Sequence, residues 1–224
     1  MSDAPRSPRE RFREQTRNEA KQVAMEQLAE SGAAGISVNA IAKRMGVTGP
    51  ALYRYFANRD ALLTELVTDG YRDLAETLEG LAHEHRGEPP EVRFREVAAG
   101  FRAWALRAPQ WFLLLFGTPV PGFRAPEGTV EFADRAFRPV LEVLAETEPP
   151  PASAADALDG QLLAWRDRRG GLAQPAPALQ KAIRAWARMH GMISLEITGQ
   201  FAGMEVDPEP LYRAEVESIL TGSW

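Results

Sequence analysis

The sequence contains no cysteine among its 224 residues, and this absence removes several chemistries at once. Disulfide bonds, zinc sites built from thiolates and catalysis by a thiol nucleophile all require cysteine. A chain without cysteine also suits the reducing interior of a cell. We therefore expect a cytoplasmic protein that has neither a disulfide framework nor a thiolate metal centre.

Long apolar segments and strand patterns are also lacking. The longest uncharged apolar run is WFLLLF at residues 111–116, whereas a transmembrane helix needs about 20 residues. The first residues, MSDAPRSPRERFREQ, lack the apolar core of a signal peptide. Alternating β-branched residues between turn clusters, the pattern of strands, extend over a few residues at most. We expect a soluble, all-α protein without a membrane partner.

Motifs of enzymes are missing as well. The sequence shows no nucleophile motif, no phosphate-binding glycine loop and no paired carboxylates in an expected cleft. His83 and His85 are the residue types of a metal site, but side chains two positions apart on a helix point in different directions. We expect no catalytic residue, no metal site and no cofactor.

Charge is present, but it is distributed unevenly. Residues 1–60 carry 10 basic and 7 acidic side chains, a net charge of +3, whereas the rest carries 16 and 24, a net charge of −8. A basic end on an acidic protein indicates a polyanionic partner for that end, although short windows also fluctuate by a few charges. The first 13 residues form a basic arm that either contacts nucleic acid or is a solvated tail; its arginines are Arg6, Arg9, Arg11 and Arg13.

Apolar periodicity predicts helices along the whole chain. The first is residues 8–31, and Ser37, Thr48 and Asn58 can each cap a following helix that runs to about residue 45, 56 or 83. WFLLLF is apolar on all sides, so we expect it to be a short, fully buried helix. Further apolar stripes predict helices at 94–108, 130–144, 158–165, 177–203 and 208–220.

Residues 38–56, VNAIAKRMGVTGPALYRYF, have the spacing of a helix-turn-helix. Ala42 provides a small residue where two helices cross, and Gly46 suits a turn with positive φ. Leu52 supplies an apolar anchor that faces the first helix, within a small core that includes Val47. Such units also occur in proteins that bind no DNA, so the spacing alone leaves DNA binding and protein contact both open.

The chemistry of the second helix favours DNA. Thr48 and the free amides beside it can hold a phosphate, and proline at position 50 costs nothing in a first helical turn. Tyrosine hydroxyls and arginines can contact phosphates, and a tyrosine ring can pack on a thymine methyl group. The alternative is that the tyrosines are half-buried packing residues and the arginines a solvated face. The expected DNA-binding set is Ser37, Thr48, Gly49, Pro50, Tyr53, Arg54, Tyr55 and Arg59.

The segment ISVNAIAKRMGVTGPALYRYFANRDALL resembles the N-terminal domain of TetR-family transcriptional regulators. The shared features are a short capped helix, a Gly-Val turn, a recognition helix of the form T-x-x-x-L-Y-x-x-F, and a following helix that opens with K/R-x-x-L-L. The resemblance implies that Arg59 contacts a phosphate at the start of the fourth helix. It also implies that Thr48, Gly49, Pro50, Tyr53 and Tyr55 face DNA.

The segments FRAWALRAPQWFLLLFGTPVPGF and WARMHGMISLE resemble a C-terminal class of that family marked by a Trp–His–Gly element, here Trp186, His190 and Gly191. The resemblance implies a ligand pocket within the C-terminal helices, dimerisation through the last two helices, and repression as the commoner mode of action. An aromatic pocket with few charges favours a small apolar or aromatic effector, whereas core packing is the alternative for each residue. The expected lining is Trp104, Phe112, Phe116, Phe137, Trp186, Met189, His190 and Ile193.

These features predict two domains, a helix-turn-helix DNA-binding domain over residues 1–60 and a helical effector-binding and dimerisation domain over 61–224. Residues 148–176, flanked by prolines and glycines, are expected to be an insertion. A homodimer formed through helices 177–203 and 208–220 would place two recognition helices on the half-sites of a palindromic operator, about 34 Å apart. The helix at 58–83 would link the two domains. The alternative function is a helix-turn-helix module for protein contacts only.

Overall fold

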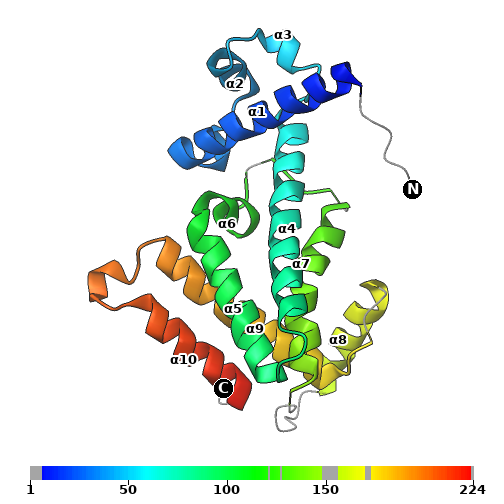
Figure 1. The fold of residues 1–224 in the computed structure, drawn as a ribbon, viewed down its shortest axis with the longest axis vertical. Helices are drawn as coiled ribbons and strands as arrows, with labels where there is room; N and C mark the ends of the chain where they lie inside the picture. Colours follow the sequence, from blue (N-terminus) through cyan, green and yellow to red (C-terminus); the bar gives the residue numbers. More distant parts are fainter. Residues whose placement is uncertain (1–6, 121, 127, 148–155, 170–172, 223–224) are drawn as a thin grey trace. The chain divides into compact units, whose positions relative to one another are not determined.

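The computed structural model describes residues 7–120, 122–126, 128–147, 156–169 and 173–222. These residues form α-helices and short 3₁₀ turns, and no strand occurs among them, which confirms the predicted all-α class (Figure 1). The chain divides into two compact units, which are treated separately below. The first unit comprises residues 1–70 and 110–129, and the second comprises residues 71–109 and 130–224.

The helices of the first unit follow the predicted order. Helix α4, Arg59–Glu84, contributes its N-terminal half to this unit and its C-terminal half to the second, and α6, Pro109–Phe116, lies almost wholly in the first. The remaining elements are α1 (Pro8–Ser31), η1 (Ala33–Gly35), α2 (Val38–Arg44) and α3 (Gly49–Leu52).

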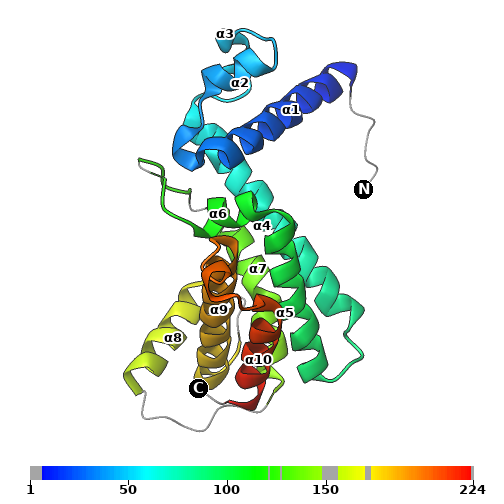
Figure 2. The same ribbon diagram turned by 90° about the vertical axis from the view of Figure 1, so that its left-hand side faces the viewer.

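The second unit contains five further helices among its described residues, and α8 and α10 both pack against α9 (Figure 2). A 3₁₀ turn, η2 (Ala202–Met204), separates α9 from α10. The helices are α5 (Pro90–Arg107), α7 (Gly128–Ala145), α8 (Asp156–Arg169), α9 (Ala176–Ile197) and α10 (Pro208–Thr221).

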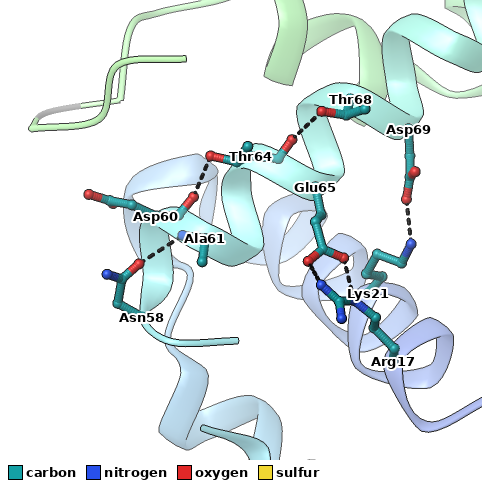
Figure 3. Close-up of polar contacts among 9 residues, drawn as sticks. All are labelled: Arg17, Lys21, Asn58, Asp60, Ala61, Thr64, Glu65, Thr68 and Asp69. Carbon is teal, nitrogen blue, oxygen red and sulfur yellow. Dashed lines mark hydrogen bonds and ion pairs between the residues drawn. The ribbon is translucent and has the colours of Figure 1, made fainter. Parts of the chain in front are cut away.

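Side-chain caps begin the helices where the sequence indicates them. Ser37 Oγ accepts a hydrogen bond from the amide of Ala40, and Thr48 Oγ1 accepts one from the amide of Ala51. Asn58 Oδ1 accepts from the amide of Ala61 at 2.8 Å at the start of α4 (Figure 3). Each cap provides a partner for an amide that the helix itself leaves unpaired.

Two predicted helix ends are wrong. Helix α3 ends at Leu52 rather than Phe56, because the next amides turn back in shorter i→i−3 bonds, from Arg54 to Ala51 O and from Tyr55 to Leu52 O. Helix α9 ends at Ile197 rather than near 203, because Gly199 takes φ +74° and its neighbours close a left-handed C-terminal turn.

The core of the first unit explains why residues 110–129 belong to it. Leu52 and Phe56 are buried with the inner faces of α1, α2 and α4. Val120 joins this cluster, and Trp111, Leu114 and Phe123 pack against it. The boundary between the two units therefore lies within α4, at residues 70–71, whereas the sequence places a boundary at 60–61. Apolar periodicity carries no signal for a segment that returns to the core 50 residues later.

The expectation for WFLLLF is also wrong. Phe112 is its only buried residue, and Leu113 is 42% exposed. The short helix offers one face to the core of the first unit, since Trp111 and Leu114 pack there, and leaves the rest partly uncovered. None of the described helices combines the length and apolar character needed to cross a membrane.

The core of the second unit follows the predicted stripes of α5, α7, α9 and α10. Leu162 of α8 is buried, and the ring of Trp165 meets Phe137 of α7 edge-on at 6.3 Å. The described part of the expected insertion is therefore an integral helix of this unit. Residues 148–155 and 170–172 of that segment lie outside the described residues. The remaining buried apolar residues include Phe94, Phe101, Trp104, Val140, Leu141, Leu179, Ala185, Met189, Ile193, Tyr212, Val216 and Ile219.

Gly70 of α4 permits the close approach of α6. A Cβ atom at this position would lie 2.7 Å from Cε3 of Trp111 and 3.3 Å from Cδ2 of Leu115. We expect Gly70→Ala to lower the free energy of unfolding by about 1–3 kcal/mol, because the indole ring must move. Gly80→Ala on the same helix meets no atom within 4 Å, and should raise stability by up to about 1 kcal/mol through helix propensity. Urea denaturation followed by circular dichroism measures both, and equal stabilisation by the two alanines would contradict this account.

Candidate functional site

The segment from α2 to α3 has the geometry of a helix-turn-helix. Gly46 lies between the helices with φ +69°, a conformation that other residues rarely adopt. The amide of Val47 donates to Ala42 O at 3.0 Å, and Ala42 is 1% exposed where the two helices meet. Leu52, the last residue of α3, is fully buried. The turn and anchor positions inferred from the spacing are confirmed.

The outer face of α3, a name that here includes Tyr53 and Arg54 in the turn directly after the helix, is polar and accessible. Thr48, Pro50, Tyr53 and Arg54 are exposed or partly exposed, and Tyr53 retains 44% of its accessible surface. Such a ring gains little by packing within the chain, and its hydroxyl remains available to a partner. Ser37, exposed at the start of α2, uses its hydroxyl as a helix cap. This face can offer hydroxyl, guanidinium and helix-terminal amide donors to phosphates.

Two members of the expected DNA-binding set have clear structural reasons to be where they are. A Cβ atom at Gly49 would lie 2.8 Å from Oδ1 of Asn39 in α2, so a side chain at this position would displace the side-chain amide of Asn39. Tyr55 is half-buried and packs against the core of the first unit. Their contacts with DNA stay predictions.

Arg59 makes hydrogen bonds within the unit. Its Nε donates to Ile36 O at 3.2 Å, and its Nη2 donates to Ala33 O at 2.7 Å. These bonds fasten the first residue of α4 to the segment between α1 and α2. The phosphate contact implied by the family resemblance stays a prediction, and a substitution of Arg59 would also remove this structural tie.

An apolar groove lies between α1 and α3 and was not inferred from the sequence. Its volume is about 320 Å³. Phe12 is 67% exposed, and Val47 is 38% exposed although the sequence placed it in the small core of the helix-turn-helix. Phe12 precedes the part of α1 that is covered, since the first buried residue of that helix is Ala20. The lining residues are Phe12, Gln15, Thr16, Glu19, Met45, Val47, Ala51, Leu52 and Tyr55.

The basic arm is partly helical. Arg9, Arg11 and Arg13 lie within α1, which Ser7 begins with a capping box: its Oγ accepts from the amide of Glu10 and its amide donates to the Glu10 carboxylate. Arg6 lies outside the described residues. A helix from Pro8 onward differs from a disordered tail, although these arginines are exposed to solvent, and a contact of the arm with DNA stays a prediction.

The second unit holds an aromatic cluster built from α5, α7 and α9. The ring of Phe101 stacks on Trp186 at a centroid distance of 4.9 Å, and Phe137 meets Trp186 edge-on at 5.6 Å. His190 lies 4.5 Å from Trp186 and 5.0 Å from Phe101. The apolar pattern indicated Phe101 only as one residue of a buried stripe.

The predicted lining of the effector pocket does not form one cluster within either unit. Trp104, Met189 and Ile193 are buried in the second unit, where Trp104 Nε1 donates to Asp73 Oδ2 at 2.7 Å. Phe112 and Phe116 belong to the first unit and contact one another at 5.2 Å. The aromatic pattern alone could not assign these residues to different units, because segments of the two units alternate along the chain.

A pocket of about 330 Å³ lies between α5 and α10, away from the expected lining. Arg102 is central to it: its guanidinium binds the Glu196 carboxylate through two hydrogen bonds and lies 5.9 Å from the ring centre of Tyr212. The buried Tyr212 hydroxyl donates to Ala98 O at 2.8 Å. The lining residues are Arg95, Glu96, Ala99, Arg102, Ala103, Glu209, Tyr212, Arg213, Val216 and Glu217.

His190 is held neutral by its surroundings. Burial lowers its pKa from 6.5 to about 4, because the imidazolium form loses hydration, and a hydrogen bond to Trp186 O opposes this shift in part. Nδ1 lies 3.0 Å from that carbonyl oxygen, which can only accept, so Nδ1 carries the proton. Among the residues that the structure describes, no three His, Asp or Glu side chains gather as metal ligands.

Comparison with known proteins decides the family. Residues 22–66 match the family model for bacterial regulatory proteins of the tetR family, and residues 94–219 match the model for the tetracyclin repressor-like C-terminal domain. The second match alone covers more than half of the chain. The chain belongs to the TetR family. It is thus a DNA-binding transcriptional regulator, as the resemblance implied.

Related proteins agree with the TetR assignment over nearly the whole chain. The HTH-type transcriptional regulators Rv1816 of Mycobacterium tuberculosis and Mb1846 of Mycobacterium bovis are each 31% identical over 222 residues, covering 93% of this chain and 92% of theirs. A crystal structure of SCO4313, described as regulatory, is 44% identical with a TM-score of 0.84, covering 96% of this chain and 100% of that one. The TetR-family regulator PfmR from Thermus thermophilus shares the fold at 17% identity, with a TM-score of 0.60, covering 91% of this chain and 97% of its own.

Tyr53 provides the simplest test of the outer face of α3. We expect Tyr53→Ala to weaken operator binding by about tenfold or more, which corresponds to one lost base or phosphate contact. The free energy of unfolding should change by less than about 0.5 kcal/mol, because the ring is exposed. Fluorescence anisotropy with a labelled operator measures the affinity, and Val130→Ala, which trims a comparably exposed residue of the second unit, is the control. Wild-type affinity in Tyr53→Ala would remove this residue from the interface.

The lowered pKa of His190 predicts a pH dependence of stability. Between about pH 4 and 6.5 the unfolded chain binds a proton at this position and the folded protein does not, so stability falls on acidification by up to about 1.4 kcal/mol per pH unit. We expect His190→Gln to lose less stability than wild type between pH 7 and 4, whereas His83→Gln, at a more accessible histidine, should follow wild type. Urea denaturation at each pH measures this difference. Parallel curves for wild type and His190→Gln would contradict the assignment.

Proposed function

We propose that this regulator binds a palindromic operator as a homodimer, represses transcription there, and responds to a small apolar or aromatic effector. The observation that carries the proposal is the outer face of α3, where a capped helix start, Tyr53 and Arg54 are exposed on a packed helix-turn-helix. Repression is the mode of action that the family resemblance implies. A DNA partner and the absence of cysteine both favour a cytoplasmic location.

The proposed dimer interface is formed by α9 and α10, which lie side by side in the second unit (Figures 1 and 2). Ile183 and Leu195 of α9 are 37% and 44% exposed, and Leu211 of α10 is 42% exposed. Arg188 holds the two helices together through an ion pair with Glu215 and a hydrogen bond to Ser218 at 2.9 Å. Two such helices paired with the same two helices of a second copy would form a four-helix interface.

The proposed effector contacts the aromatic cluster around Trp186. Stacked rings and a neutral His190 give this region an apolar character with a single polar group, which suits a ligand with aromatic or aliphatic surface. Helix α4 is one covalent path between the two units, because this continuous helix contributes to both; the chain also crosses at residues 109–110 and 129–130. An effector that binds one arrangement of the dimer better than another would then shift the population that can bind DNA.

A helix-turn-helix used for protein contacts is the second candidate. The groove between α1 and α3 favours it, because Phe12 and Val47 expose apolar surface beside the recognition helix. Nucleic-acid interfaces are more polar and more basic than this groove. The two candidates predict different outcomes in a DNA selection.

Selection from random duplex DNA tests the proposal, followed by binding to the recovered sequence across a salt series. We expect a palindrome whose half-sites lie about one helical repeat apart, with affinity that falls steeply as salt increases. Tyr53→Ala should bind the recovered sequence about tenfold or more weakly while it remains a folded dimer. Recovery of no sequence by a folded, dimeric protein at low salt and in the absence of effector would favour the protein-contact candidate.

The dimer interface has its own test. We expect Leu195→Arg or Leu211→Arg to dissociate the dimer, because a buried arginine in a self-complementary interface has no paired charge. Leu158→Arg on α8, where the leucine is 39% exposed, changes the same residue type outside the proposed interface and should leave the dimer intact. Sedimentation velocity distinguishes monomer from dimer. Dissociation by Leu158→Arg alone would place the interface on α8 instead.

A further inference from the structure

Two ion pairs fasten α1 to α4 within the first unit. Arg17 Nε donates to Glu65 Oε2 at 2.7 Å and its Nη2 donates to Glu65 Oε1, so the pair is bidentate. Lys21 Nζ lies 2.6 Å from Asp69 Oδ2. Figure 3 shows the two pairs one helical turn apart on each helix. Because the spacing is four residues on both helices, the pairs form a double clasp rather than a single contact.

Arg17 also connects this clasp to the end of the recognition segment. Its guanidinium carbon lies 5.2 Å from the ring centre of Phe56, which is 1% exposed and lies just after α3. One side chain of α1 therefore contacts both α4 and the residue that anchors the turn after the recognition helix. The hydrogen bond to Glu65 raises the pKa of Arg17 above its ordinary value, which is consistent with a paired guanidinium.

The surroundings of the clasp explain why its pairs can hold. The Arg17 and Glu65 side chains retain 35% and 25% of their accessible surface, and those of Lys21 and Asp69 retain 20% and 28%. Fully exposed ion pairs contribute little because water and salt screen them. Partial burial reduces that screening, and the bidentate geometry of the Arg17–Glu65 pair fixes the orientation of the two helices.

Basic residues near a DNA-reading helix would ordinarily be assigned to phosphates. Here each of the two already has a carboxylate partner on α4, and a phosphate contact would have to displace that partner. We propose that Arg17 and Lys21 are positioning residues and that they do not bind DNA. They hold α1, the Phe56 anchor and α4 rigidly around the recognition helix α3, and these elements together are called the reader below. Their effect on affinity acts through the orientation of α3.

The clasp also has a consequence for the dimer, and this part rests on the proposed function. In a palindromic complex both readers must match the groove repeat at once. A reader that is loosely held on α4 tolerates a wider range of half-site separations, at the expense of affinity for the best one. A tight clasp therefore sets both the affinity for one half-site and the selectivity for operator spacing.

Neutralising the acidic partner separates positioning from phosphate binding, because the two roles predict opposite signs. If Arg17 binds a phosphate, Glu65→Gln frees it and removes a negative charge near DNA, so affinity should rise. Positioning predicts instead that Glu65→Gln lowers affinity by about fivefold to tenfold, in the range of a modest coupling free energy. Asp60→Asn is the matched control, because its carboxylate lies on the same helix but apart from Arg17 and Lys21 in Figure 3.

A charge exchange supplies the second arm. Arg17→Glu or Glu65→Arg alone should lower affinity, and the double variant, which has the net charge of wild type, should recover most of it. The slope of log affinity against log salt should match wild type in Glu65→Gln and in the double variant, since no phosphate contact is lost. Thermal unfolding of each variant ensures that affinity is compared between folded proteins.

Duplexes with a single half-site and palindromes whose spacer is changed by one base pair in either direction are the probes. The single half-site measures the clasp without the dimer, so failure of the proposed palindrome leaves the affinity test in place. Positioning predicts weaker half-site binding and a flatter spacer preference in Glu65→Gln. A rise in affinity similar to that of Asp60→Asn would overturn the proposal. So would a folded double variant that stays weak and has a salt slope reduced by about one.

Discussion

The burial of Leu52 and Phe56 is the constraint on which the reader depends. These two side chains fix which face of a very short helix is turned inward. Tyr53 and Arg54 therefore face outward. Four residues of α-helix could not hold this orientation alone, because isolated helices of that length are unstable. The core supplied by α1, α2 and α4 holds it for them, and the return of Trp111 and Val120 from a distant part of the chain completes that core.

The two units differ in the interactions described here: ion pairs and hydrogen bonds of basic residues in the first, and buried aromatic packing in the second. In the first, carboxylates of α4 pair with Arg17 and Lys21, and backbone carbonyls accept hydrogen bonds from Arg59, so each of these basic residues also has a structural contact within the unit. In the second, stacked rings surround a histidine that burial keeps neutral. The proposed function uses both properties: a rigid first unit converts small changes in orientation into changes in DNA affinity, and an apolar cluster suits a ligand with aromatic or aliphatic surface.

Local rules predicted much of this fold, and long-range packing accounts for most of the differences. Ser37, Thr48 and Asn58 act within one turn of their own position, so the helix starts could be identified from the sequence. The glycine turn and the leucine anchor were found in the same way. The place of α6 in the first unit, the assignment of Phe112 and Trp186 to different units, and the carboxylate partners of Arg17 and Lys21 depend on residues far apart in the chain. Periodicity identifies a buried face, but it does not identify which core the face joins.

Hydroxyl-radical footprinting of the protein on its selected operator tests most simply whether the exposed face of α3 reads a DNA sequence. We expect protection of two patches of backbone on one face of the duplex, centred about one helical repeat apart, and weaker protection of both patches when Tyr53 is replaced by alanine in a protein that remains folded. Uniform protection, or no protection at low salt by a folded dimer, would show that the exposed face of α3 does not read a DNA sequence.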